Sequence, residues 1–242
     1  MIIHEFINNK KPVMVLIHGV LTPWQIWKPQ IEFFKNSYTV YVVSLNAHNE
    51  EKASEFISVK AEAEQIVMLL IEKGVQTIDA LCGISLGGKI AYEIWKSGKI
   101  EISNLIMDGA PLVKCPKFAV NIMINNYKNI IHKSKKRDAK IIENYLESYL
   151  KIADLMTDNS IENMVSSVFS ESEIKASNNR GRLLFIHGTK GNEILSRKSA
   201  RKIKESYPDA EIICFRGDAH CYKAIHQPEK WIKVVNDFLR RV

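Results

Sequence analysis

The chain has 242 residues, of which 46% are hydrophobic and 25% are charged, and its formal net charge is +7. This length suffices for one large hydrophobic core, and the composition is that of a globular protein rather than a disordered or fibrous one. Because no apolar run reaches membrane-spanning length and no basic-then-apolar leader opens the chain, we expect no membrane span and a cytoplasmic location.

The predicted elements alternate between short apolar strands and amphipathic helices. An edge strand is expected at 2–7, and further strands are expected near 12–17, 39–45, 77–82, 102–107, 182–186 and 210–215. A last helix is expected near 229–240. This alternation is typical of an α/β fold with a mostly parallel sheet covered by helices on both faces.

The clearest helical pattern runs from about residue 54 to residue 73. Its apolar residues recur at helical spacing, and Ser54 is a suitable N-cap for it. The acidic residues Glu62 and Glu64 are expected to face away from the core. Residues 112–177 break the alternation of strands and helices with a long stretch of helical pattern, after which strand character returns at Arg182.

Four cysteines, Cys82, Cys115, Cys214 and Cys221, are spread along the chain without metal-type spacing. Two of them lie within predicted strands. We therefore expect reduced thiols and no metal site.

The basic residues are densest from Lys133 to Arg137, with Lys140 close behind. Such a run can bind nucleic acid or a membrane surface. Aromatic residues and glycines do not interleave with these charges, which favours a solvated helix face. We therefore expect no nucleic-acid partner, and a salt-dependent binding test separates the two interpretations.

The segment Gly83-Ile84-Ser85-Leu86-Gly87 joins a predicted strand to a predicted helix. A serine on such a sharp turn adopts a strained backbone, and glycines two residues to either side are needed because a side chain there would collide with the neighbouring strand or helix. The following helix directs its N–H groups at the serine, so negative charge that develops there is stabilised. The segment predicts a catalytic nucleophile at Ser85.

A base and an acid for this serine follow it in the chain. His220 comes after the last predicted strand, with a final helix still to follow, and Glu193 is the acid of a polar loop after His187-Gly188. The order serine, acid, histidine separates this arrangement from the two other well-known orders of serine triads. Asp108, at the end of the preceding strand, is an alternative acid.

These residues, together with the strand that runs into His18-Gly19-Val20, resemble the α/β-hydrolase superfamily over nearly the whole chain. The resemblance implies an oxyanion hole formed by the backbone N–H groups of Val20 and Leu86. It also implies a helical cap at 112–177 inserted into a core of residues 1–111 and 178–242. The chain departs from the family pattern at Gly191, where relatives usually carry the triad carboxylate.

The sequence thus predicts a serine hydrolase that cleaves a carboxylic ester or thioester through an acyl-Ser85 intermediate, without metal or cofactor, on a small-molecule ester-like substrate. A peptidase, a lactonase or a carbon–carbon bond hydrolase would use the same triad. A ligand-binding or sensor protein with little turnover is the alternative from another class, and the irregular acid loop is the feature that favours it. The oligomeric state does not follow from the sequence.

Overall fold

The computed structural model describes residues 1–8, 12–136, 145–174, 180–191 and 193–241. Its main sheet has seven strands, in the order β1-β3-β2-β5-β7-β8-β9. Only β1 is antiparallel to its neighbour, and it lies at the sheet edge, while the other neighbours pair in parallel. The strands span Ile2–Phe6 (β1), Val13–Ile17 (β2), Thr39–Ser44 (β3), Ala80–Ile84 (β5), Asn104–Asp108 (β7), Arg182–His187 (β8) and Glu211–Cys214 (β9). The mostly parallel sheet expected from the sequence is confirmed.

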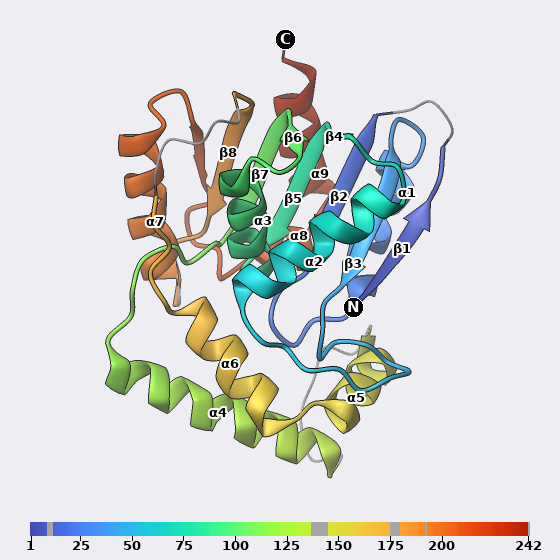
Figure 1. Ribbon diagram of the computed structural model, residues 1–242. Coiled ribbons are helices and arrows are strands. Elements are labelled where there is room, and N and C mark those ends of the chain that lie inside the picture. Colours follow the sequence, from blue (N-terminus) through green and yellow to red (C-terminus); the bar gives the residue numbers. More distant parts are fainter. Residues whose placement is uncertain (9–11, 137–144, 175–179, 192, 242) are drawn as a thin grey trace.

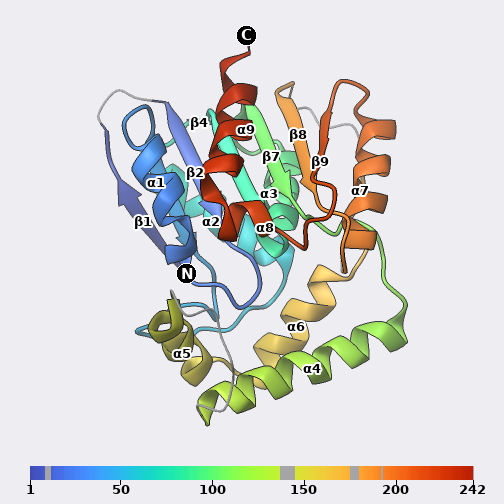
Figure 2. The ribbon, with the colours of Figure 1, turned by 180° about the vertical axis from the view of Figure 1, so that it is seen from behind.

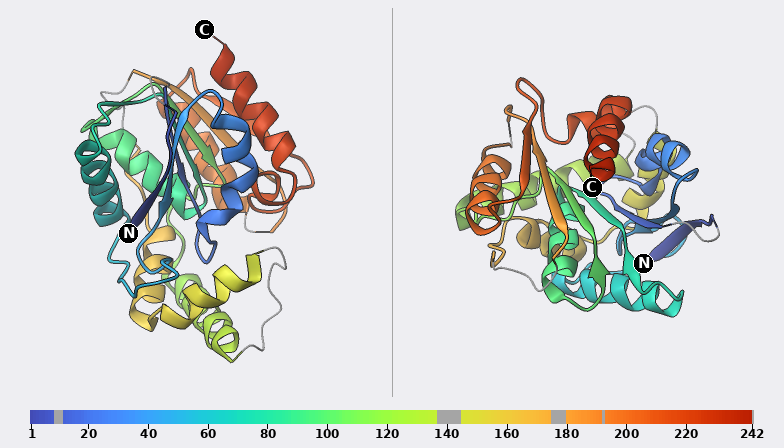
Figure 3. Two further views of the ribbon diagram at one scale, coloured as in Figure 1. Left: turned by 90° about the vertical axis from the view of Figure 1, so that its right-hand side faces the viewer. Right: turned by 90° about the horizontal axis from the view of Figure 1, so that it is seen from above.

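Helices cover both faces of this sheet, as its apolar strands require. One face carries α2 (Val59–Glu72), α3 (Leu86–Ser97) and α7 (Glu193–Ser206), as Figure 1 shows. The opposite face carries α1 (Lys28–Phe34), α8 (Tyr222–His226) and α9 (Pro228–Arg240), seen in Figure 2, with a 3₁₀ turn at Trp24–Trp27. The side view in Figure 3 shows the sheet between these two layers.

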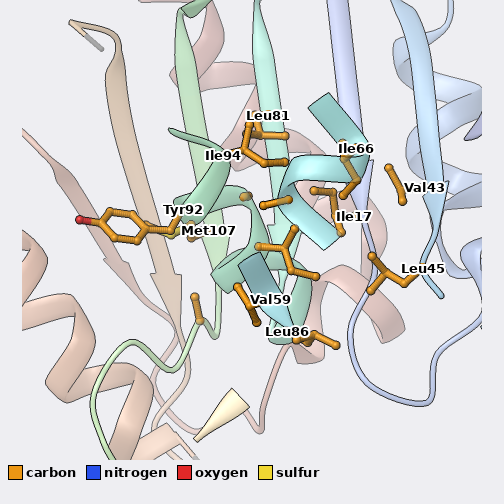
Figure 4. Close-up of a cluster of buried hydrophobic side chains, with 14 of the residues drawn as sticks. Ile17, Val43, Leu45, Val59, Ile66, Leu81, Leu86, Tyr92, Ile94 and Met107 are labelled. Carbon is orange, nitrogen blue, oxygen red and sulfur yellow. The ribbon is translucent and has the colours of Figure 1, made fainter. Parts of the chain in front are cut away.

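The larger core cluster lies between the sheet and the layer of α2 and α3 (Figure 4). Ile17, Val43 and Leu81 project into it from three adjacent strands and are fully buried. Ile66 and Leu86 meet them from the two helices. This packing fixes α3, and with it the turn that precedes α3, against the middle of the sheet.

Among the described residues between β7 and β8, three α-helices lie beyond the end of the sheet at which these strands finish (Figure 1). They are α4 (Lys117–Lys135), α5 (Leu146–Leu155) and α6 (Asp158–Val168). The segments that enter and leave them run side by side, because the backbone N–H of Cys115 donates to Phe169 O at 3.0 Å and that of Ser172 donates to Leu112 O at 2.9 Å. The division into a core and an inserted cap at 112–177 stays a prediction, and residue 177 lies outside the described residues.

Two details of α2 differ from the sequence prediction. The helix begins at Val59, and its N-cap is Ser58, whose Oγ accepts a hydrogen bond from the N–H of Ala61 at 3.1 Å, so Ser54 is not the cap. Glu62 does not face away from the core but is buried, where its carboxylate accepts bonds from the backbone N–H and the side-chain amide of Asn46. A tertiary partner thus overrides the polar character of the residue.

The remaining sequence predictions concern the surface and the thiols. Within the described part of the chain, no helix combines the length and apolarity that crossing a bilayer requires. All four cysteines are free.

Of the basic run from Lys133 to Lys140, Lys135 donates to the carbonyl of Met156 at 2.8 Å, whereas Arg137 and Lys140 lie outside the described residues. The expectation that this run binds no nucleic acid stays a prediction.

Candidate active site

Ser85 occupies the turn between β5 and α3. Its backbone angles are φ 51° and ψ −116°, a left-handed conformation that is strained for any residue with a side chain. Its N–H donates to the carbonyl of Asp108 at 2.8 Å, which ties the turn to the end of β7. The nucleophile position predicted from the sequence therefore has the sharp strand-to-helix turn that such a position requires.

The glycines that flank Ser85 are required by close backbone contacts. A Cβ at Gly83 would lie 2.2 Å from the carbonyl oxygen of Gly87, and a Cβ at Gly87 would lie 2.3 Å from that of Ile17. Neither position has room for a methyl group. The glycine spacing seen in the sequence thus reflects the packing of the turn against β2 and against itself.

Ser85, His220 and Glu193 form a continuous hydrogen-bonded chain. His220 Nε2 lies 2.9 Å from Ser85 Oγ, and His220 Nδ1 is hydrogen-bonded to Glu193 Oε1. Because a carboxylate accepts only, Nδ1 carries the proton, which leaves Nε2 free to accept the serine hydroxyl proton. The imidazole side chain is 30% exposed, whereas the Glu193 side chain is fully buried.

The sequence predicted that Glu193 lies in a polar loop. In the structure it is the first residue of α7. Its second oxygen accepts the backbone N–H of Gly188 at 2.8 Å, so both oxygens have partners. Gly191, where the family pattern would place the acid, has φ 58° and a Cβ site open to solvent. Gly191 has a left-handed backbone conformation, and the carboxylate belongs to Glu193, two residues later, at the start of α7.

Asp108, the alternative acid, is buried but does not contact His220. Its Oδ2 has no hydrogen-bond partner within the described part of the chain. Burial, reinforced by the nearby charge of Glu193, raises the pKa of Asp108 well above its usual range. The hydrogen bond of His220 Nδ1 is thus accepted by Glu193 and not by Asp108.

The loop after β2 packs directly against Ser85, since a Cβ on Gly19 would lie 3.3 Å from the Ser85 Cβ. The backbone N–H groups of Val20 and Leu86, at this loop and at the start of α3, donate to no acceptor among the described residues. Lack of a protein acceptor is one requirement for the donors of an oxyanion hole.

Two buried histidines lie beside this loop and bond to backbone N–H groups. His18 Nε2 accepts the N–H of Leu45 at 3.1 Å. His48 Nε2 accepts the N–H of Leu21 at 3.0 Å. Burial lowers the pKa of His48 to about 4, and that of His18 is also well below its usual value. No local motif marks His48, because its partner is 27 residues away.

A cavity of about 40 Å³ opens beside Ser85 and His220. Its other described lining residues are mostly apolar and come from both the sheet side and the helices between β7 and β8: Val20, Pro111, Tyr127, Val165, Val168, Phe169, Leu195 and Ser196. No lysine, arginine, aspartate or glutamate belongs to this described lining. In the conformation seen here, the cavity has room for only a few water molecules.

No metal site accompanies this cavity among the residues that the structure describes. No group of three or more histidine, cysteine, aspartate or glutamate side chains there has the arrangement to hold a metal ion. The chemistry available in the described site is that of a hydroxyl, an imidazole, a carboxylate and backbone N–H groups.

Solved structures with low sequence identity share this fold. An α/β hydrolase family protein from Desulfitobacterium hafniense superposes with a TM-score of 0.78 at 22% identity, covering 98% of this chain and 100% of that chain. An esterase from Exiguobacterium antarcticum gives a TM-score of 0.77 at 16% identity, covering 98% and 94% of the two chains. The chain therefore has the α/β-hydrolase fold expected from its motifs.

Sequence similarity to a known protein covers less of the chain than the structural similarity does. The 2-succinyl-6-hydroxy-2,4-cyclohexadiene-1-carboxylate synthase of Pectobacterium atrosepticum is 30% identical over 107 residues, which make up 44% of this chain and 42% of that protein. The match thus spans less than half the length of the curated relative. No protein-family model matches the sequence.

Proposed function

We propose that this α/β-hydrolase-fold protein is a serine hydrolase that cleaves a small, uncharged carboxylic ester or thioester through an acyl-Ser85 intermediate. The observation that carries the proposal is the hydrogen-bonded chain from Ser85 through His220 to the buried Glu193. A serine hydroxyl is a weak nucleophile at neutral pH, and a neutral imidazole aimed at it supplies the missing base.

In the proposed reaction, His220 Nε2 removes the Ser85 proton as Oγ attacks the ester carbonyl carbon. The resulting imidazolium is stabilised by the Glu193 carboxylate, which is fully buried and so acts at low dielectric. His220 then donates the proton to the leaving alkoxide or thiolate. Water, activated by the same imidazole, hydrolyses the acyl-serine and restores the free hydroxyl.

The charge that develops on the carbonyl oxygen needs donors that are not already in use. The N–H groups of Val20 and Leu86 meet that need, because no described residue accepts from them. The amide of Leu86 also lies at the N-terminus of α3, where the helix dipole favours negative charge. We assign the oxyanion to these two groups.

The cavity lining supports an uncharged substrate with a short acyl chain. Its described residues offer apolar contacts and no cationic side chain. The Pectobacterium relative is named as the synthase of a carboxylate, and a ligand carboxylate in the cavity would be stabilised by lysine or arginine. The lining seen here therefore favours a neutral ester, and the small volume favours acetyl over longer acyl groups.

The sensor alternative loses the feature that favoured it in the sequence. That feature was the missing carboxylate at Gly191, and Glu193 reaches His220 from the start of α7 instead. Nothing else about the described site separates it from a working hydrolase. Peptide, lactone and carbon–carbon substrates share the same attack on a carbonyl, and direct comparison of peptides and lactones with esters separates the first two from the proposed substrate class.

The proposal is tested by measuring hydrolysis of p-nitrophenyl esters from acetate to hexanoate, of an acyl group bearing a carboxylate, and of peptide and lactone substrates. We expect acetate to be hydrolysed fastest and Ser85→Ala to lose about 10⁶-fold in turnover. Ser97→Ala is the matched control, since Ser97 lies at the other end of α3 with its Oγ bonded to Ile94 O. A Ser85→Ala protein that retains wild-type rates contradicts the proposal.

A further inference from the structure

A buried lysine connects the helix that follows Ser85 to a wall of the cavity. Lys89 lies on α3, one turn after Ser85, and is 2% exposed. Its Nζ donates to Val168 O at 3.0 Å, to Ser170 O at 2.5 Å and to Ser170 Oγ at 3.2 Å. All three acceptors belong to the end of α6 and the residues directly after it.

The ammonium form of Lys89 fits these acceptors, and the neutral amine does not. Ser170 Oγ donates its own proton to Ser167 O at 2.7 Å, so toward Lys89 it can only accept. An ammonium group has three N–H donors for three acceptors, whereas a neutral amine has two. The positive charge also lies at the C-terminus of α6, where the helix dipole favours a cation.

The other end of α6 is held by a group of opposite charge. Ser160 Oγ donates to Glu55 Oε2 at 2.6 Å, and Thr157 Oγ1 donates to Glu55 Oε1 at 2.8 Å. These hydrogen bonds lower the pKa of Glu55, so the carboxylate is charged at the helix N-terminus. The segment before α2 and the helix α3 thus hold α6 at its two ends.

The helix held in this way forms one side of the cavity. Val165 and Val168 of α6, and Phe169 directly after it, line the cavity that contains Ser85 and His220. The bond from Lys89 to Val168 O therefore acts on a lining residue itself. Because α3 also carries Ser85 at its start, one helix sets both the position of the nucleophile and the distance to the opposite wall.

We propose that Lys89 is a positioning residue that holds the α6 wall against the Ser85 site and thereby restricts the acyl group to a short chain, and that loss of its proton releases this wall. The assignment of the cavity as the acyl site rests on the function proposed above, but the tether between α3 and α6 does not.

The change of protonation falls near neutral pH. Burial lowers the pKa of Lys89 to about 7, with Glu93 on the same helix acting in the opposite direction. Glu93 is paired with Lys96 at 2.8 Å. From the other elements, Glu171 follows Ser170 and is paired with Lys202 of α7 at 3.0 Å. Below pH 7 the ammonium holds all three oxygens, and above pH 7 the amine cannot.

The tether is tested first by hydrogen exchange, which needs no enzyme activity. The reporters are the amides of Phe169 and Ser172, which donate to Val165 O and Leu112 O. Their protection factors, corrected for intrinsic exchange, are measured at pH 6 and pH 8.5 in the wild type, in Lys89→Met and in Lys233→Met. Lys233→Met is the control because it removes a lysine whose ion pair, with Asp237 at 2.7 Å, lies within α9 on the opposite face of the sheet.

We expect wild-type protection to fall about tenfold between pH 6 and pH 8.5, because a charge-assisted bond is lost. Protection in Lys89→Met should be low at both pH values, and protection in Lys233→Met should match that of the wild type. Equal protection of the wild type at both pH values, together with equal protection in Lys89→Met, overturns the tether.

The effect on specificity is tested by the ratio of kcat/KM for p-nitrophenyl acetate to that for the hexanoate. Both esters are attacked by the same Ser85 and His220, so a pH effect on this shared step cancels in the ratio at any one pH. We expect the ratio to fall about tenfold in Lys89→Met and in the wild type at pH 8.5. A ratio independent of pH and of Lys89 overturns the specificity role. Complete absence of ester hydrolysis in the wild type contradicts the proposed function instead, and the exchange result still decides the tether.

Discussion

At the scale of single residues, Glu193 and Asp108 show how environment assigns roles to two buried carboxyl groups. Glu193 uses one oxygen for His220 and the other for the N–H of Gly188. Asp108 leaves Oδ2 without a partner among the described residues, and burial raises its pKa. The first is placed to orient a base, and the second is a buried carboxyl group whose charged form is disfavoured by its surroundings.

Replacing each carboxyl by its amide separates these roles. Glu193→Gln should lower ester turnover by about 10⁴, because an amide supports the wrong imidazole tautomer and cannot stabilise the imidazolium. Asp108→Asn should change turnover by less than about tenfold, since the hydrogen bonds of His220 go to Glu193 and Ser85 and asparagine has the same shape as aspartate. Steady-state kinetics on one ester at one pH measures both, and the reverse ranking would move the acid to Asp108.

At the scale of elements, the turn between β5 and α3 depends on the backbone contact between Gly87 and β2. A methyl group at Gly87 would lie 2.3 Å from Ile17 O, so Gly87→Ala must displace the turn and Ser85 with it. A displacement of about 1 Å costs about 100-fold in rate. Gly74→Ala is the control, because a Cβ at Gly74 meets nothing within 4 Å, although its φ of 81° makes the substitution costly to the fold. Similar activity losses in the two variants would show that loss of stability, not the contact with β2, is the cause.

Elements whose determinants are local were predictable, and those with distant partners were not. The turn at Ser85 follows from glycines two residues away. The strand expected at 77–82 is instead divided into β4 (Thr77–Ile78) and β5. Asp79 lies between them, and its side-chain Oδ2 accepts a hydrogen bond from the N–H of Val13 at 2.7 Å. A strand expected at 102–107 is likewise divided into β6 (Glu101–Ile102) and β7. Lys89 bonds to a residue 79 positions away, which no periodicity records.

At the scale of the whole molecule, the two buried histidines make stability depend on pH. The folded protein lowers the pKa of His48 from 6.5 to about 4, and that of His18 also falls well below 6.5. Between about pH 6.5 and pH 4 the unfolded chain therefore binds more protons than the folded chain. The contribution of these neutral histidines to the free energy of unfolding is fully present above this window and is lost as the pH falls through it.

Urea unfolding at pH 7 and pH 4.5 measures this dependence. Titration of His48 alone should contribute up to about 3 kcal/mol to the loss of unfolding free energy. His48→Gln keeps an acceptor for the N–H of Leu21 and removes the titration, so its stability should fall less on acidification than that of the wild type. The same pH dependence in both proteins would exclude His48 as a source of acid instability.

The central claim, that Ser85 is a nucleophile activated by His220, is tested most directly by covalent labelling with a fluorophosphonate, followed by mass spectrometry of the intact protein and its peptides. We predict one adduct per chain, located on Ser85, retained in Ser97→Ala and absent in Ser85→Ala. No adduct on the folded wild type, or an adduct on a residue other than Ser85, would contradict the claim.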